Sequence, residues 1–430
     1  MPLEPSRWLP DRGFFRKLMT LSSGTIAGQA LVLLSSPLLT RLYDPQQFGV
    51  FAVFAAMAGI FAVNASLRYE FAVPVLRENS DAAAAVLLAM LGATASALLL
   101  AVVVAVAGER IATGLAIPEL AAWLWLLPPA ALLWGCGSAL SYWSVRRGSY
   151  RVNGINRTLQ LGTQAGGQVA LGLAGAGMPG LLVGYIAGYV VRFGHFSSRL
   201  PAADRALLRA VRRASLRQVA RQSWRYPALA MPSSLLQAIC DLAPVLLVAM
   251  LYGPAMAGWY GLSQRIMAAP VKILSEAASQ VFLGEARGLD RRELHRFFLR
   301  TLTLFGGLGL LGTLPLLLFA PPLFGLVFGP EWREAGVIVQ ILVPLYLARF
   351  IVFPISQLLY IFNRQDLHFV VSALNLLALG VSFGAGAVMQ LDSRTTLIMF
   401  SLASAASFLL YLGISWRLVH VGSRLPSSAA

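Results

Sequence analysis

The sequence predicts an all-α polytopic membrane protein with about twelve transmembrane helices. Of its 430 residues, 57% are hydrophobic and only 12% are charged, whereas soluble domains carry about 25% charged residues. A run of about 20 apolar residues crosses a bilayer as a helix. Twelve such runs follow one another along the chain: 18–40, 48–66, 82–107, 119–143, 154–174, 178–196, 226–250, 256–283, 297–319, 335–361, 368–389 and 395–416. They leave almost no chain for a soluble domain.

The distribution of basic residues predicts that both termini are cytosolic. If the N-terminus is inside, the outer segments hold only four of the 34 Lys and Arg residues: Arg41, Arg110, Arg333 and Arg394. Seven more lie within the predicted spans or directly at their ends, and the cytosolic segments hold the remaining 23, as the positive-inside rule requires. The formal charge of +16 therefore indicates contact with anionic membrane lipids and not with nucleic acid.

The two halves of the chain contain a repeated pattern. RLYDPQQFGVF (41–51) and MLYGPAMAGWY (250–260) share the pattern L-Y-x-P-x3-G. Two further pairs match at slowly increasing offsets: Pro118-Glu119 with Pro330-Glu331, and Tyr142-x3-Arg146 with Tyr360-x3-Arg364. Because each half holds six spans, the two copies share one orientation. We expect two six-helix bundles related by a pseudo-twofold axis along the membrane normal.

The repeat predicts three parts: an N-terminal bundle (1–197), a basic cytosolic linker (198–223) and a C-terminal bundle (224–430). Arginines recur at helical spacing in the linker: Arg205, Arg209, Arg212, Arg213, Arg217 and Arg221. A modest apolar side is offered by Leu207, Leu208, Val211 and Val219. The pattern fits an amphipathic helix lying on the cytosolic leaflet. It fits a solvated basic linker equally well.

Three charged residues share one face of the eighth predicted span. Arg265, Lys272 and Glu276 fall within roughly 40° of one another when each helical residue advances about 100°. A charge facing lipid at mid-bilayer costs about 2.5 to 3.5 kcal/mol, so this face should contact protein or a wet cavity. Lys272 and Glu276 are spaced to form a salt bridge. Asp241, in the preceding span, is the nearest candidate partner of Arg265.

Other spans add further cations. Arg349 lies near the middle of the tenth span and Arg192 lies in the sixth, while Arg68 and Glu70 sit at the cytosolic boundary of the second. Snorkelling accounts for this boundary pair as well as a functional role does.

Cations outnumber acids within the spans, and this excess predicts a site for a mobile anion. A diphosphate is the natural candidate, because arginine forms bidentate pairs with phosphate oxygens. The candidate substrate-binding residues are Arg265, Lys272, Arg349, Arg192 and Arg68. The candidate acids for ion coupling or salt bridging are Asp241, Glu276 and Glu70.

Polar uncharged residues accompany these charges. One face of the fifth span carries Asn153, Arg157, Gln160, Gln164 and Gln168, and the first span carries Ser22, Thr25, Gln29 and Ser36. Such groups bind sugar hydroxyls in a wet lumen, or they join helices at about 0.6 kcal/mol per bond. We favour the lumen and assign its lining to Gln29, Gln160 and Gln164. Neither a metal-ligand spacing nor a catalytic arrangement is evident, so we expect a transporter without a cofactor and not an enzyme.

The chain resembles the Wzx-type oligosaccharide flippases. The resemblance extends over nearly the whole chain and is strongest in LSSGTIAGQALVLLSSPLLTRLYDPQQFGVFAVFAAMAGIFAVNASLRYEFAVPV and in YGLSQRIMAAPVKILSEAASQVF. These flippases form the polysaccharide branch of the multidrug, oligosaccharidyl-lipid and polysaccharide exporter (MOP) superfamily. By matching, Arg265 and Arg68 are the positions to which a substrate role transfers.

The resemblance implies alternating access between two six-helix bundles with a cationic central cavity. The substrate would be a polyprenyl-diphosphate-linked oligosaccharide, moved from the cytosolic to the outer leaflet of a bacterial inner membrane for O-antigen or exopolysaccharide synthesis. The expected partners are membrane lipids and a polysaccharide polymerase with its co-polymerase.

A cation-coupled multidrug exporter of the same superfamily is the alternative. Such exporters carry an acidic cation site in their first or seventh span. The first span here has no acid, and in the seventh only Asp241 qualifies.

Overall fold

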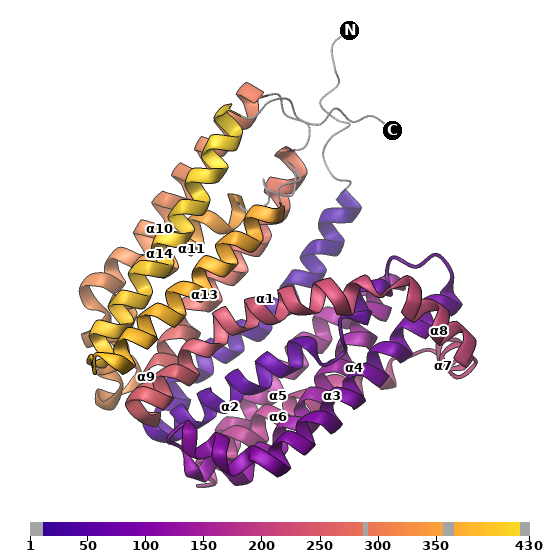
Figure 1. Cartoon of the computed structure of the whole chain (residues 1–430), viewed down its shortest axis with the longest axis horizontal. Coiled ribbons are helices and arrows are strands. Elements are labelled where there is room, and N and C mark those ends of the chain that lie inside the picture. Colours follow the sequence, from indigo (N-terminus) through magenta and orange to yellow (C-terminus); the bar gives the residue numbers. More distant parts are fainter. Residues whose placement is uncertain (1–11, 287–290, 356–364, 422–430) are drawn as a thin grey trace. The chain divides into compact units, whose positions relative to one another are not determined.

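The computed structural model describes residues 12–286, 291–355 and 365–421, and these ranges contain thirteen α-helices and no strand. The α-helices are α1 (Arg12–Leu42), α2 (Pro45–Asn64), α3 (Asn79–Gly114), α4 (Leu127–Arg146), α5 (Tyr150–Leu173), α6 (Met178–Ser198), α7 (Ala202–Arg209), α8 (Arg213–Gln222), α9 (Met231–Ala286), α10 (Arg291–Phe328), α11 (Arg333–Ile355), α13 (Gln365–Val388) and α14 (Ser393–Val421). Short 3-10 helices, η2 (Tyr69–Ala72), η3 (Pro118–Leu126) and η5 (Pro330–Trp332), and a π-helical turn, η4 (Tyr226–Ala230), connect some of them. Figure 1 shows this helical architecture.

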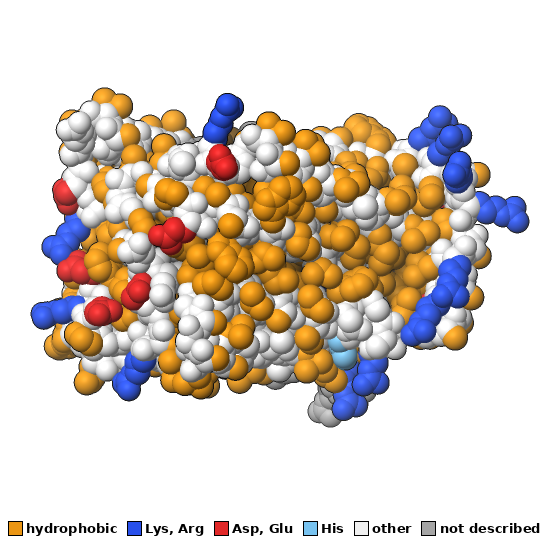
Figure 2. Space-filling view, turned by 90° about the horizontal axis from the view of Figure 1, so that it is seen from below, with side chains coloured by type: hydrophobic (Ala, Val, Ile, Leu, Met, Phe, Trp, Pro, Cys, Tyr) orange, Lys and Arg blue, Asp and Glu red, His pale blue; other side chains and the backbone are white. Residues whose placement is uncertain are grey.

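The predicted all-α membrane fold is confirmed. Eight described helices are long and apolar enough to cross a membrane. One of them, the 46-residue Tyr226–Val271, contains the seventh predicted span and the first part of the eighth, and its backbone leaves the helical conformation at Gly253 (φ 85°, ψ 171°). The remaining predicted spans correspond to α1, α5 and α6. Figure 2 shows one face, which is covered mainly by hydrophobic side chains, as contact with lipid requires.

The helices group into two compact units. The first unit comprises residues 16–261, and the second comprises the described residues 12–15 and those from 262 onward. The first unit therefore contains the six N-terminal spans, the linker and the seventh span. The division of the sequence at 198–223 remains a prediction.

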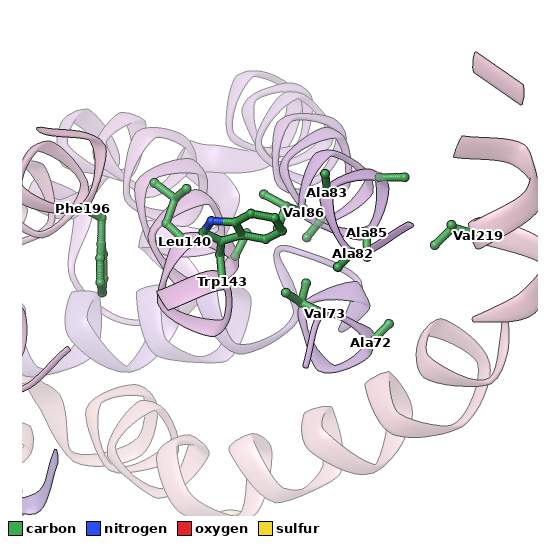
Figure 3. Packing of buried hydrophobic residues seen from close by; sticks show 13 residues of the cluster. Ala72, Val73, Ala82, Ala83, Ala85, Val86, Leu140, Trp143, Phe196 and Val219 are labelled. Carbon is green, nitrogen blue, oxygen red and sulfur yellow. The ribbon is translucent and has the colours of Figure 1, made fainter. Parts of the chain in front are cut away.

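The first unit has a core of small residues packed around a tryptophan. Trp143 of α4 is 1% exposed and lies against the alanine run Ala82–Ala85 and Val86 of α3. Figure 3 shows the Trp143 ring extending towards Val86. Because alanine side chains are small, the backbones of α3 and α4 can approach closely.

The linker is packed against this core. It forms the short helices α7 and α8, which both contact α3. Val219 of α8 is fully buried in the core cluster. Asp204 of α7 is 5% exposed, and it accepts hydrogen bonds from Trp143 Nε1 at 2.9 Å and from Arg147 Nη2 at 2.5 Å. The apolar side of the linker thus faces α3, while its arginines are exposed.

The repeated motif brings two helices of the first unit into reciprocal contact. Pro45 opens α2, and Pro254 follows the break at Gly253. A Cβ on Gly49 would lie 1.7 Å from the carbonyl oxygen of Pro254, and a Cβ on Gly258 would lie 1.9 Å from that of Pro45. The glycine of each copy therefore leaves room for the proline backbone of the other copy.

The second match of the repeat also has a structural counterpart. Pro118 opens η3 before α4, and Pro330 opens η5 before α11. The third match involves Tyr360 and Arg364, which lie outside the described residues. Two of the three sequence matches thus occupy equivalent local structures.

The second unit is built on α10, α11, α13 and α14. Helix α11 packs against both α10 and α14, and α13 packs against α14. Figure 1 shows these four helices running alongside one another. Phe298 of α10, Ile355 of α11 and Val419 of α14 share one buried cluster.

Candidate functional site

The polar face of α5 packs against a row of glycines on α6. A Cβ on Gly184 would lie 2.7 Å from the backbone nitrogen of Gln168, and a Cβ on Gly188 would lie 2.7 Å from the carbonyl oxygen of Gln160. Glycines spaced by four residues lie on one helix face and allow close helix contact in a membrane. The amide side chains of α5 are therefore held within the bundle of α4, α5 and α6.

Polar residues towards both ends of α5 join it to its neighbours. Asn153 exchanges hydrogen bonds with Ser141 of α4, at 2.8 Å to its Oδ1 and at 3.2 Å from its Nδ2. Gln168 Nε2 donates to the carbonyl oxygen of Leu181 of α6 at 3.0 Å, and the backbone carbonyl oxygen of Gln168 accepts from the Tyr43 hydroxyl at 2.7 Å. These residues connect helices, as the alternative reading of the polar face predicted.

Two arginines in the middle of α5 and α6 converge on one amide oxygen. Arg157 Nη1 donates to Gln160 Oε1 at 3.0 Å, and Arg192 Nη1 approaches the same atom at 3.4 Å. Arg192 Nη2 lies 3.4 Å from Ser138 Oγ of α4. We call Arg157, Gln160 and Arg192 the arginine cluster.

Aromatic rings border the arginine cluster. The guanidinium carbon of Arg192 lies 4.4 Å from the ring centroid of Trp134, a cation–π contact. Trp134 packs edge-on against Tyr189, whose hydroxyl donates to that of Tyr185 at 2.6 Å. These rings exclude water from one side of the cation, so its charge is weakly screened.

The guanidinium of Arg192 is buried and poorly satisfied. The residue is 8% exposed, and its two hydrogen bonds are both 3.4 Å long. Its Nε is buried and has no hydrogen-bond partner among the described residues, although a guanidinium carries five N–H donors. Among the described residues, no carboxylate forms an ion pair with Arg192. An anion would supply the acceptors that this group lacks.

Arg68 and Glu70 form an ion pair just beyond the end of α2. Arg68 Nη1 lies 3.5 Å from Glu70 Oε1, and Glu70, 2% exposed, also accepts from Ser66 Oγ at 2.6 Å. The arginine also lies over the Phe71 ring, 4.8 Å from its centroid. These contacts of Arg68 and Glu70 are thus with each other and with their near neighbours in sequence, and not with the arginine cluster.

The predicted residues of the eighth and tenth spans lie in the second unit. Arg265 on α9 and Arg349 on α11 are both half-buried. The side chains of Lys272 and Glu276 lie outside the described part of the structure. Asp241, in the first unit, is half-buried and accepts from Gln237 Nε2 at 3.1 Å. The bridge between Asp241 and Arg265 remains a prediction.

The predicted amide residues differ in their surroundings. Gln160 is 2% exposed and belongs to the arginine cluster, whereas Gln164 is 8% exposed one turn further along α5. Gln29 of α1 is half-buried. Their role as a cavity lining remains a prediction.

Sequence reasoning did not assign Arg157 or the aromatic border to the site. A signal was present: Tyr185, Tyr189 and Arg192 are spaced as i, i+4 and i+7 on one helix face. The same holds for Trp134 and Ser138, one turn apart on α4. The sequence could not show that these faces meet.

Comparison with solved structures finds membrane transporters that share this fold. The chain is similar to the lipid II flippase MurJ in an inward closed conformation, with a TM-score of 0.71 and 10% identity over 93% of this chain and 89% of that one. It is also similar to an inward-facing multidrug resistance MATE family transporter of the MOP superfamily, with a TM-score of 0.64 and 14% identity over 96% and 100% of the two chains. A MOP superfamily transporter from Pyrococcus furiosus gives a TM-score of 0.57 and 13% identity over 95% and 96%.

Sequence comparison identifies the family. No curated protein matches the chain. Residues 38–337 match the family model described as polysaccharide biosynthesis protein, which is well over half of the 430 residues. The resemblance noted in the sequence is thereby confirmed. The chain belongs to the polysaccharide biosynthesis protein family and has the fold of the MOP superfamily transporters.

Proposed function

We propose that the protein is a flippase for polyprenyl-diphosphate-linked oligosaccharides, moving them from the cytosolic to the outer leaflet of a bacterial inner membrane. The family membership and the fold it shares with MurJ support a transporter in polysaccharide synthesis. The proposal adds the substrate, the direction of transport, and the placement of both termini in the cytosol.

The observation that carries the proposal is the buried, poorly satisfied guanidinium of Arg192 within a predicted membrane span. A site for cationic drugs would place an acid at this depth, because a cation is stabilised by a nearby carboxylate. A cation bordered by Trp134 and Tyr189 favours an anionic substrate that also carries sugar rings. Arg265, Arg349 and Lys272 of the second unit are further proposed substrate-binding cations.

Transport would proceed by alternating access of the two predicted bundles, 1–197 and 224–430. Asp241 is the proposed coupling residue, because it is the acid near the middle of the seventh span. A protonatable carboxylate there would link transport to the proton gradient. Asp241→Asn should lose pH-dependent transport, and normal pH-responsive transport by this variant would refute the role.

Gene deletion in the native host tests the function. Cells without the protein should lose a surface polysaccharide and accumulate its polyprenyl-diphosphate-linked repeat unit. Expression of the native chain should restore the polymer, and Arg192→Gln should not, when both are normalised to membrane abundance. Arg217→Gln on α8, exposed to solvent, is the matched control and should restore it fully.

The same strains distinguish the multidrug exporter. An exporter predicts that deletion raises sensitivity to cationic drugs and leaves the surface polymer intact, which would overturn the proposal. Cross-linking of the restored protein in these cells would also test the proposed partnership with a polymerase and co-polymerase.

A further inference from the structure

The arginine cluster places two like charges around one neutral oxygen. Arg157 Nη1 and Arg192 Nη1 lie 3.0 Å and 3.4 Å from Gln160 Oε1, so the two nitrogens can be no more than 6.4 Å apart. Two cations this close repel each other, and the repulsion is stronger at the poorly screened, buried position of Arg192. An amide oxygen offsets this only in part, because it carries a partial charge.

Gln160 is buried, so water cannot take the place of its side-chain oxygen between the two arginines. The residue is 2% exposed, and its backbone carbonyl packs against Gly188 of α6. Its side-chain Oε1 accepts from the two arginines. Rotation of this side chain would remove the acceptor that the two guanidinium groups share, and both groups point at its position.

The Nε of Arg192 gives a second and independent indication of a ligand. This donor is buried, belongs to a residue that is 92% buried, and finds no acceptor in the part of the chain that the structure describes. A buried N–H without an acceptor is costly, and native structures rarely retain one without a functional reason. A tetrahedral oxyanion could accept from Nε and Nη of one guanidinium at once, in the bidentate geometry that arginine favours.

We propose that Arg157 and Arg192 form a phosphate-binding site in the first unit, and that Gln160 Oε1 occupies the position of a phosphate oxygen until the substrate displaces it. The inference rests on the proposed function for the source of the phosphate, which is the diphosphate of the lipid-linked substrate. Arg192 holds one phosphate bidentately and Arg157 contacts it from the less buried side. While no substrate is bound, Gln160 Oε1 thereby prevents small anions from binding to the two arginines.

A purely structural cluster predicts different behaviour of Gln160. If its role were packing alone, Gln160→Glu would alter stability without any link to ligand. If it stands in for phosphate, Gln160→Glu places a permanent carboxylate between two arginines. That variant should melt at a higher temperature without ligand and should no longer respond to diphosphate. Gln160→Ala should instead bind diphosphate more tightly, because no internal oxygen competes.

The test measures ligand-dependent melting of the purified full chain in detergent. The probes are a polyprenyl diphosphate, inorganic diphosphate and phosphatidylglycerol. Polyprenyl diphosphate should raise the melting temperature of the native chain, and Arg157→Gln and Arg192→Gln should each weaken its apparent affinity at least tenfold. Arg217→Gln and Gln218→Glu, both on the exposed side of α8, should leave it unchanged. If Arg192→Gln fails to fold, Arg192→Lys replaces it, and it should also weaken binding because an ammonium cannot bind bidentately.

Native affinity in both folded arginine variants would overturn the site, as would an undiminished diphosphate response of Gln160→Glu. Equal, arginine-dependent stabilisation by phosphatidylglycerol would overturn its assignment to the substrate. Failure of the proposed function is distinguishable: the deletion strain would then export polymer normally, whatever the purified protein binds. Conversely, a deletion strain lacking polymer with native binding by both arginine variants would refute this site alone.

Discussion

The reciprocal contact between the two copies of the repeated motif predicts that one added methyl group destabilises the protein. In Gly258→Ala the new Cβ would lie 1.9 Å from the Pro45 carbonyl oxygen, and in Gly49→Ala it would lie 1.7 Å from that of Pro254. Ordinary van der Waals contact begins at 3.4 Å, so the helices must separate by roughly 1.5 Å. Overpacking costs about 1 to 3 kcal/mol, and a clash with backbone belongs at the upper end, at about 3 kcal/mol.

The double variant makes this argument sharper. Separation of the helices for one methyl group also makes room for the other, because both lie in the same contact. Gly49→Ala with Gly258→Ala should therefore cost clearly less than the sum of the single changes, as expected for coupled neighbours.

Melting of the purified chain in detergent at a fixed scan rate provides the assay. Gly166→Ala on α5 is the matched control, because no atom lies within 4 Å of its added Cβ. That control should be neutral or stabilise by up to about 1 kcal/mol, the difference in helix propensity. Single variants at Gly49 and Gly258 that melt like Gly166→Ala would refute the reasoning, and so would strictly additive effects.

Two further predictions concern the ends of helices. Asp204→Ala should lower the free energy of unfolding by about 1 to 3 kcal/mol, because the Trp143 N–H is left buried without an acceptor. Limited proteolysis at the arginines of α7 should become faster, and an unchanged cleavage rate would contradict this. The pKa of Asp392 is lowered because its carboxylate accepts hydrogen bonds from the side chain and then the backbone of Thr395. Its stabilisation of the start of α14 should therefore be present above pH 3.8, the ordinary pKa, and be lost as the pH falls through the lowered folded value. Hydrogen exchange of the amides at 393–396 measures this, and Asp392→Asn should remove the pH dependence; a variant that keeps it would contradict the assignment.

The fold was predictable because lipid imposes a simple rule on sequence. A chain must satisfy its backbone internally to cross a bilayer, and so each long apolar run predicts a helix. This held even for α5, which carries many polar residues and is not among the eight helices that are apolar enough to cross a membrane by composition. The break at Gly253 lies in the interval 251–255 that separates the seventh and eighth predicted spans, although the helix is otherwise continuous across it.

The candidate site was predictable only in part. Arg192 and Gln160 were identified because charges and amides are costly within a span. Their partners were not, since contact between residues 32 positions apart depends on how α5 and α6 pack. The glycines Gly184 and Gly188 hold that packing, and their significance emerges only when the opposing backbone is known.

The reciprocal contact of Gly49 with Pro254 and of Gly258 with Pro45 has the form of an isologous interface, in which each partner offers the other the same surface. A six-span ancestor carrying one copy of the motif would have been self-complementary, and two such chains would have met as a homodimer. If two such chains were joined end to end through a segment such as 198–223, the dimer contact would become a contact within one molecule. This contact also explains why the motif is still recognisable in both halves although the rest of their sequences differ. A side chain added at either glycine would collide with the backbone of the other copy, so the same steric requirement acts on both halves.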